Sequence, residues 1–205
     1  MRTGALAVGL FLGATPIAAQ APGVPIVNAG FSRGFTLGSM VGFNNASAGD
    51  GTGFMVSGTV GFRRIAVGGF VSGLTGSMLS SETRVAGGAT VAVKLAGGPL
   101  VPVAITLLTG AGYYSVDRSL TTSWRVPVGL GISWTIPQPV VALKLWASPR
   151  LDYARVRGSD FGLSGGVNLG FLNGFGIDLA VDRLFASEPS SKPASFGLGA
   201  SYHFK

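Results

Sequence analysis

The chain has 205 residues, of which 47% are hydrophobic and 11% charged, so it lacks the charged surface of a water-covered globule, in which about 25% of residues are charged. Its formal charge of +7 comes from scattered basic residues with one adjacent pair, Arg63-Arg64, a pattern that excludes the basic stripe of a nucleic-acid-binding protein. With no cysteine and 34 glycines, the chain has no disulfide or thiolate metal site and favours strands and turns over helices.

Residues 1–19 have the pattern of a secretory signal peptide. A short, positively charged start is followed by the apolar stretch 4–13 and then by small residues up to Ala19. We predict cleavage between Ala19 and Gln20. The alternative, an uncleaved N-terminal anchor, is disfavoured because three prolines between residues 16 and 25 interrupt any longer helix.

After a lead at residues 20–34, which we expect on the periplasmic side, apolar residues alternate with small or polar ones. The mean hydropathy is +0.49, yet no later run of about 18 apolar residues could span a membrane as a helix. The alternation predicts ten strands, with eight as the alternative. They cover residues 35–43, 54–63, 65–74, 84–95, 101–114, 124–136, 140–153, 160–171, 175–184 and 196–205.

The predicted strands differ in how regular the alternation is. Residues 124–136 alternate without a break, whereas residues 65–74 are the least regular because Phe70 breaks the alternation. Asn173-Gly174 predicts a tight hairpin turn. The first, third, fifth, seventh and ninth connections are expected to be long and the others short, as is typical of outer-membrane barrels.

Three observations favour an apolar face that points outward into lipid over a soluble barrel or sandwich. The opposite face, built from Gly, Ser, Thr and Ala, is too bland to keep a protein in solution. An even number of strands places both termini on the periplasmic side. Aromatic pairs near the strand ends are spaced like the two girdles of a membrane barrel. The pairs are Phe35 and Phe43, Phe54 and Phe62, Trp124 and Trp134, Phe161 and Phe171, and Phe196 and Phe204.

The last strand carries a further signal. Gly199, followed by Tyr202 and Phe204, resembles the assembly signal of bacterial outer-membrane β-barrels. Two positions depart from the usual pattern: Gly197 stands where that signal has a polar residue, and Lys205 follows the terminal aromatic.

The resemblance implies an all-β, transmembrane, antiparallel up-and-down barrel over residues 35–205. It implies a location in the bacterial outer membrane, with outer-membrane lipids and the barrel-assembly machinery as partners. It leaves the narrower subfamily open.

The polar faces carry charged residues that would point into the lumen. One interpretation is a salt-bridged network that fills the barrel, since buried charges need partners. The other is a narrow, mildly anion-preferring passive pore, and ten strands with a glycine-rich lumen are compatible with both. The residues are Arg63, Arg84, Lys94, Arg125, Lys144, Arg150, Asp152, Asp178 and Asp182.

An outer-membrane enzyme and a loop-mediated adhesin are the alternative classes. The single histidine, His203, shares a face with Ser201 but lies near the periplasmic end, away from the cell surface. Asp178 and Asp182 lie about 13 Å apart along their strand, too far for a paired-carboxylate site. The loops are short and low in charge, which disfavours an adhesin. We therefore expect a non-enzymatic, monomeric barrel with no cofactor and no metal, either structural or narrowly permeable.

Overall fold

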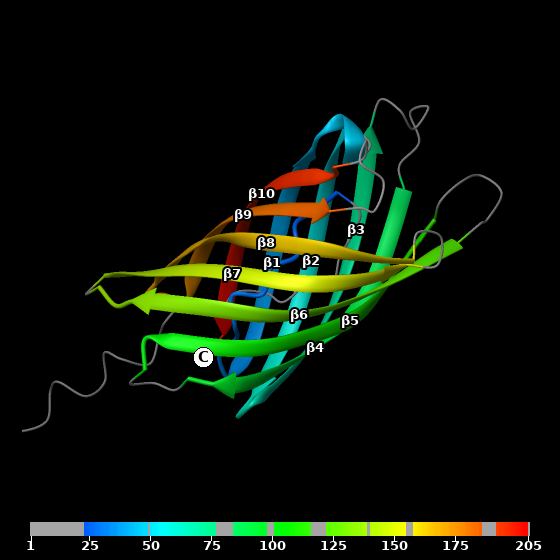
Figure 1. The fold of residues 1–205 in the computed structure, drawn as a ribbon. Coiled ribbons are helices and arrows are strands. Elements are labelled where there is room, and N and C mark those ends of the chain that lie inside the picture. Colours follow the sequence, from blue (N-terminus) through cyan, green and yellow to red (C-terminus); the bar gives the residue numbers. More distant parts are fainter. Residues whose placement is uncertain are drawn as a thin grey trace, which may run out of the picture.

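The computed structural model describes residues 23–48, 50–76, 84–97, 101–115, 122–138, 140–154, 158–185 and 192–204. Within them the chain forms ten strands and one short 3-10 helix (Figure 1). These are β1 (Gly34–Asn44), η2 (Ala46–Ala48), β2 (Gly51–Phe62), β3 (Ile65–Gly76), β4 (Arg84–Ala96), β5 (Val103–Ser115), β6 (Thr122–Ile136), β7 (Val141–Ala154), β8 (Gly158–Phe171), β9 (Phe175–Phe185) and β10 (Ala194–Phe204). No helix in these ranges is long and apolar enough to cross a membrane. The predicted signal peptide, residues 1–19, lies outside them.

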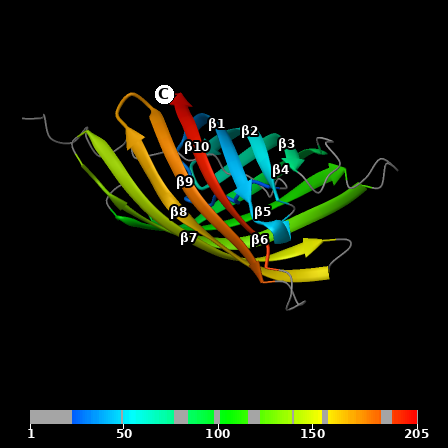
Figure 2. The ribbon, with the colours of Figure 1, turned by 90° about the horizontal axis from the view of Figure 1, so that it is seen from above.

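The strands close into a barrel (Figures 1 and 2). Each strand pairs in antiparallel orientation with the next one along the chain, and β10 closes the ring by pairing with β1 from Phe204↔Phe35 to Ser195↔Asn44. The ten-stranded, antiparallel up-and-down barrel predicted from the sequence is confirmed, and the eight-stranded alternative is excluded.

The two ends of the barrel differ. We call the end that holds Gly34 and Phe204 the turn end, and the opposite end, which holds Asn44 and Ala194, the loop end. The predicted hairpin at Asn173-Gly174 lies at the turn end, where Gly174 has a φ of 90° and the Asn173 side-chain oxygen accepts a 3.0 Å hydrogen bond from the backbone N–H of Phe175. Such a positive φ favours glycine, so this turn is specified locally.

The lengths of the connections do not alternate as predicted. At the loop end only residues 155–157 join β7 and β8, because the pairing continues to Ala154↔Gly158. At the turn end residues 97–102 form a longer connection than expected, because the register between β4 and β5 shifts near Lys94 and β5 begins at Val103. The prediction was wrong at these two connections.

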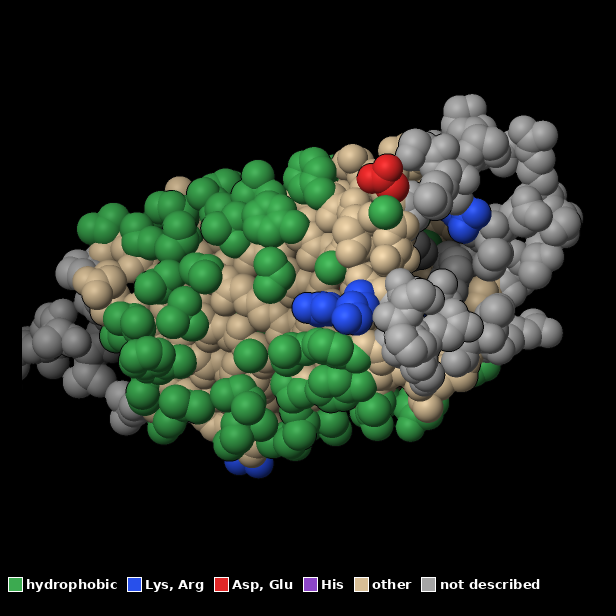
Figure 3. Space-filling view, turned by 45° about the horizontal axis from the view of Figure 1, so that its top comes forward, with side chains coloured by type: hydrophobic (Ala, Val, Ile, Leu, Met, Phe, Trp, Pro, Cys, Tyr) green, Lys and Arg blue, Asp and Glu red, His purple; other side chains and the backbone are tan. Residues whose placement is uncertain are grey.

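The outer face of the barrel is apolar. Outward-facing side chains such as Val56, Leu130 and Val181 are about half exposed, at 47%, 43% and 55%, and Figure 3 shows groups of hydrophobic side chains spread along the barrel in this view. The aromatic residues of the predicted girdle pairs all lie on this outer face. Phe35 and Phe204 face each other across the closing seam, with ring centroids 5.5 Å apart.

β3 keeps the alternation that its sequence left uncertain. Val67 and Val71 are exposed on the outer face, while Phe70 and Leu74 are buried on the inner face. Phe70 therefore faces inward in a regular strand. Its ring is accommodated there because it joins an apolar cluster of the interior.

The interior is occupied by the chain's own residues 23–32, which we call the luminal segment. Residues 24–31 are all buried, and Ile26 and Ala29 have no exposed surface at all. We expected residues 20–34 to form a periplasmic lead, but the described part of that lead lies inside the barrel. The physical reason is the apolar character of residues 24–31 (VPIVNAGF). Removing their apolar side chains from water lowers the free energy of the folded chain.

The luminal segment runs lengthwise through the barrel. Gly23 lies against Gly53 near the loop end, and Ser32 lies against Gly61 near the turn end. The chain then turns into the wall at Gly34, whose φ of 106° favours glycine.

Candidate functional site in the lumen

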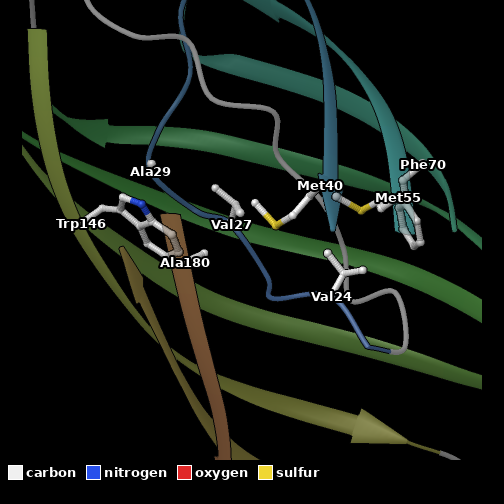
Figure 4. Packing of buried hydrophobic residues seen from close by; sticks show 8 residues of the cluster. All are labelled: Val24, Val27, Ala29, Met40, Met55, Phe70, Trp146 and Ala180. Carbon is white, nitrogen blue, oxygen red and sulfur yellow. The ribbon is translucent and has the colours of Figure 1, made fainter. Parts of the chain in front are cut away.

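The luminal segment packs against the barrel wall on two sides. On one side Val24, Val27 and Ala29 lie among wall residues of β1, β2, β3, β7 and β9 (Figure 4). On the other side Ile26 and Phe31 contact β3, β4 and β5. The wall residues are Met40, Met55, Phe70, Trp146 and Ala180 in the first cluster and Ala66, Ala92 and Leu108 in the second. These contacts turn the lumen into a packed interior.

Glycines of the wall make room for the backbone of the luminal segment. At four wall glycines an added Cβ would overlap a carbonyl oxygen of the segment; the pairs are Gly42 and Gly53 with Gly23, Gly61 with Ser32, and Gly131 with Asn28. A Cβ at Gly197 would lie 2.9 Å from Cδ of Pro25. Any larger residue at these positions would conflict with the segment, so the glycine-rich lumen face forms its seat.

Polar contacts fix the register of the luminal segment. The Asn44 side-chain amide donates a 3.3 Å hydrogen bond to the carbonyl oxygen of Gly23, and the Asn28 side-chain amide donates a 3.2 Å bond to the hydroxyl of Ser148. The backbone N–H of Ile26 lies 3.5 Å from Oδ2 of Asp182. The last contact joins the segment to the charged residues of the wall.

Four of the predicted lumen residues form one buried ion-pair cluster in the loop-end half of the barrel. Arg150 Nε lies 2.8 Å from Oδ2 of Asp152, and Arg150 Nη2 lies 2.7 and 2.9 Å from the two carboxylate oxygens of Asp182. Arg125 Nη2 contacts Oδ2 of Asp152 at 2.9 Å. The side chains of Arg150, Asp152 and Asp182 are at most 3% exposed, so the charges compensate one another away from water.

Two glycines leave space for the central guanidinium of this cluster. A Cβ at Gly129 would lie 2.7 Å from Cβ of Arg150, and a Cβ at Gly162 would lie 2.6 Å from Cζ of Arg150. Both glycines face Arg150 in the register, from β6 and β8. The sequence thus provides the two cations and two carboxylates of the cluster, and the two glycines leave the space that Arg150 occupies.

Asp178 is the centre of a second polar group. Its two carboxylate oxygens accept hydrogen bonds from the Asn168 side-chain amide at 2.9 Å and the Ser201 hydroxyl at 3.2 Å. Lys144 is opposite Asn168 in the register, and Asn168 is opposite Asp178, so the three buried side chains form a row across β7, β8 and β9.

The other predicted lumen residues lie apart from these groups. The Lys94 ammonium lies 5.1 Å from the ring centroid of Phe31, in cation–π geometry with the luminal segment. Arg84 begins β4 at the loop end and is half-buried. Arg63 was expected on the lumen face, but it lies exposed in the turn between β2 and β3, because β2 ends at Phe62.

Ser201 and His203 each contact another polar residue of the lumen. The Ser201 hydroxyl donates to Asp178, and His203 Nδ1 lies 3.0 Å from the hydroxyl of Thr36 on the neighbouring strand. Among the described residues no group of three or more His, Cys, Asp or Glu side chains could hold a metal ion.

Two features of the interior were not predicted from the sequence: the luminal segment and the buried carboxylate of Asp160. Asp160 is 8% exposed and lies opposite Asp152 in the register, so it adds a carboxylate beside the ion-pair cluster. The signal for the luminal segment was present: eight residues with five apolar side chains precede a wall whose inner face is rich in glycine.

The chain matches no protein-family model and no curated protein. Solved structures similar to it include the outer membrane enzyme PagL, which is 9% identical with a TM-score of 0.48 over 82% of this chain and 99% of that chain. The KdgM porin in complex with disordered oligogalacturonate is 10% identical with a TM-score of 0.49, over 83% and 99% of the two chains. Ail, the attachment invasion locus protein of Yersinia pestis, is 12% identical with a TM-score of 0.29, over 83% and 96%. An enzyme, a porin and an attachment protein differ in activity, so no activity follows from these likenesses.

Proposed function

We propose that the chain is an integral outer-membrane β-barrel of a diderm bacterium, non-enzymatic and structural, with a lumen closed by its own luminal segment. The observation that carries this proposal is the polarity of the wall. Leu130 and Val181 on the outer face are about half exposed, whereas Arg150, Asp152 and Asp182 on the inner face are buried. A soluble barrel has the reverse arrangement, and a barrel in lipid has this one.

The luminal segment supports a structural role over an open passive pore. It is buried from Val24 to Phe31, and the wall contacts it on both sides. The position of the single histidine supports the non-enzymatic part, because His203 lies at the turn end, opposite Thr36 and away from the loop end.

The orientation and partners follow from the two ends of the barrel. The turn end, with Phe204, would face the periplasm, and the loop end would face the cell surface. In β10, Gly199, Tyr202 and Phe204 would be recognised by the barrel-assembly machinery. Closure between β1 and β10 leaves no free sheet edge, which supports a monomer in contact with outer-membrane lipids.

The proposal is tested by expressing the chain from its first residue in a diderm host and separating the membranes. We expect the protein in the outer-membrane fraction, with different gel migration before and after boiling, because a closed barrel resists detergent at room temperature. Recovery in the soluble periplasmic fraction, with one migration position under both conditions, would show the proposal to be wrong.

A further inference from the structure

The wall around the luminal segment carries many buried hydroxyl side chains beside its glycines and apolar residues. Apolar wall residues contact the segment in two clusters, and the hydroxyl side chains lie on the same inner face. The polar wall residues without charge are Thr36, Ser57, Thr59, Ser72, Thr90, Thr106, Ser123, Ser133, Ser148, Ser164, Asn168 and Ser201. Hydroxyl side chains of this kind also line the water-filled lumen of membrane barrels.

Several of these hydroxyls are not satisfied by the protein. Ser57, Ser72, Thr106 and Ser123 are at most 4% exposed, and their hydroxyls have no hydrogen-bond partner among the described residues. Thr106 lies beside the luminal segment, with its hydroxyl 3.6 Å from where a Cβ of Gly30 would be. A buried hydroxyl without a hydrogen-bond partner destabilises the folded state. Water can supply the missing partners of such hydroxyls, so this part of the wall is suited to contact with water.

The luminal segment is not one of the strands of the wall. The barrel ladder closes from β1 to β10 without it. The contacts that hold it include two apolar clusters, the glycine seats, the cation–π contact of Lys94 with Phe31 and the hydrogen bonds at Gly23, Ile26 and Asn28. Its departure would therefore break no strand pairing of the barrel.

We propose that the luminal segment is a removable plug, and that its departure opens a passage through the barrel for small, uncharged, hydroxyl-bearing solutes. The solute class follows from the lining, in which serine and threonine are the commonest buried polar side chains and the cations lie against carboxylates, as Arg150 does against Asp152 and Asp182. This inference rests on the proposed membrane-barrel function and adds a transport activity to it.

Liposome swelling with a pentose sugar tests the passage. Gly61→Ala and Gly131→Ala place a methyl group against the backbone of Ser32 and Asn28 and so destabilise the seated plug. Gly58→Ala is the matched control, because its Cβ would make an ordinary 3.5 Å contact with the ring of Phe35 on the outer face. We expect swelling at least several-fold faster for the two seat variants than for the wild type, with Gly58→Ala unchanged.

A reversible cross-link tests whether the plug must move for solutes to pass. The natural chain has no cysteine, so Asn28→Cys combined with Ser148→Cys gives a single thiol pair where the two side chains are 3.2 Å apart. Joined by a disulfide or a short thiol-reactive linker in the Gly131→Ala background, the pair should return swelling to the rate of protein-free liposomes. A reducing agent should restore the fast rate of the disulfide form.

The outcomes separate this proposal from the one on which it rests. Heat-dependent gel migration of each liposome preparation shows whether a folded barrel is present. If the folded seat variants swell no faster than the wild type, or if cross-linked Gly131→Ala swells as fast as the reduced form, the plug proposal is wrong and the barrel assignment stands. If the wild type itself forms no folded barrel in lipid, the proposed function fails, and the plug proposal fails with it.

Discussion

Arg150 organises the charged part of the lumen as a single residue. Its guanidinium bonds to Asp152 on the same strand and to Asp182 on β9, and Asp182 in turn contacts the backbone of Ile26 in the luminal segment. The space for this side chain comes from Gly162 on the neighbouring strand. One cation thus links two strands of the wall and the segment inside it.

Removal of Arg150 should destabilise the barrel. Arg150→Met leaves Asp182 buried without its cation, and the loss of one partner of a buried pair costs about 3–5 kcal/mol. Urea unfolding in lipid vesicles measures this change in free energy. Arg183→Met is the control, because Arg183 is exposed on the outer face of the same strand as Asp182. The double variant Arg150→Met with Asp182→Asn should regain part of the stability, and an equal loss in Arg150→Met and Arg183→Met would contradict the assigned role.

At the scale of the element, β10 both completes the wall and contacts the interior. Its outward residues Leu198 and Tyr202 are exposed, whereas Gly197 and Gly199 face inward. A Cβ at Gly199 would lie 2.9 Å from the carbonyl oxygen of Ser39 and 3.0 Å from Cε of Met40, both on β1. The seam therefore requires a small residue at this position for packing, whatever is recognised during assembly.

Two variants of β10 should separate packing from recognition. Gly199→Val overpacks the seam at a cost of about 1–3 kcal/mol, so we expect poorer folding both in vesicles and in cells. Tyr202→Ala removes a lipid-facing ring, so it should fold into vesicles nearly as well as the wild type but reach the outer membrane in lower amount. Leu198→Val serves as a control for an outward substitution. Normal levels of Tyr202→Ala in the outer membrane would remove this residue from the assembly signal.

The elements were more predictable than the interior. The strands follow from the alternation of apolar and small residues, which is unbroken from Trp124 to Ile136 because one side faces out and the other in. The charges of Arg150 and Asp182 could be assigned to the lumen for the same reason. The luminal segment could not, because a chain that crosses a lumen outside the sheet has no period, and the glycines that seat it look the same as glycines that line a pore.

At the scale of the whole molecule, the barrel is an apolar cylinder around a polar, charged interior. The outer face is apolar from Phe35 near the turn end to Phe43 near the loop end, and Asp152 and Asp178 lie on the inner face. This separation only stabilises the molecule if lipid surrounds it, so the cost of an outward charge should depend on its depth.

A pair of arginine substitutions on the outer face tests this dependence. Leu130 lies near the middle of β6, and Val103 begins β5 at the turn end. Their side chains are equally exposed, at 43% and 42%. Leu130→Arg should lower the free energy of unfolding in vesicles by about 2–4 kcal/mol, and Val103→Arg by about 0–1 kcal/mol. Equal effects of the two substitutions would indicate a barrel surrounded by water.

The seam between β1 and β10 has a consequence for the order of folding. Phe35 and Phe204 come from opposite ends of the barrel sequence, so their pairing closes the longest loop in the wall. Closing a long loop costs more conformational entropy, and contacts between distant residues form slowly, so we expect this pairing to form last. The luminal segment precedes β1 directly, so it can take its place inside the curved sheet while the ring is still open. The wall is then completed around a segment that is already in place. We expect a truncated chain without β10 to hold the segment against an open, curved sheet.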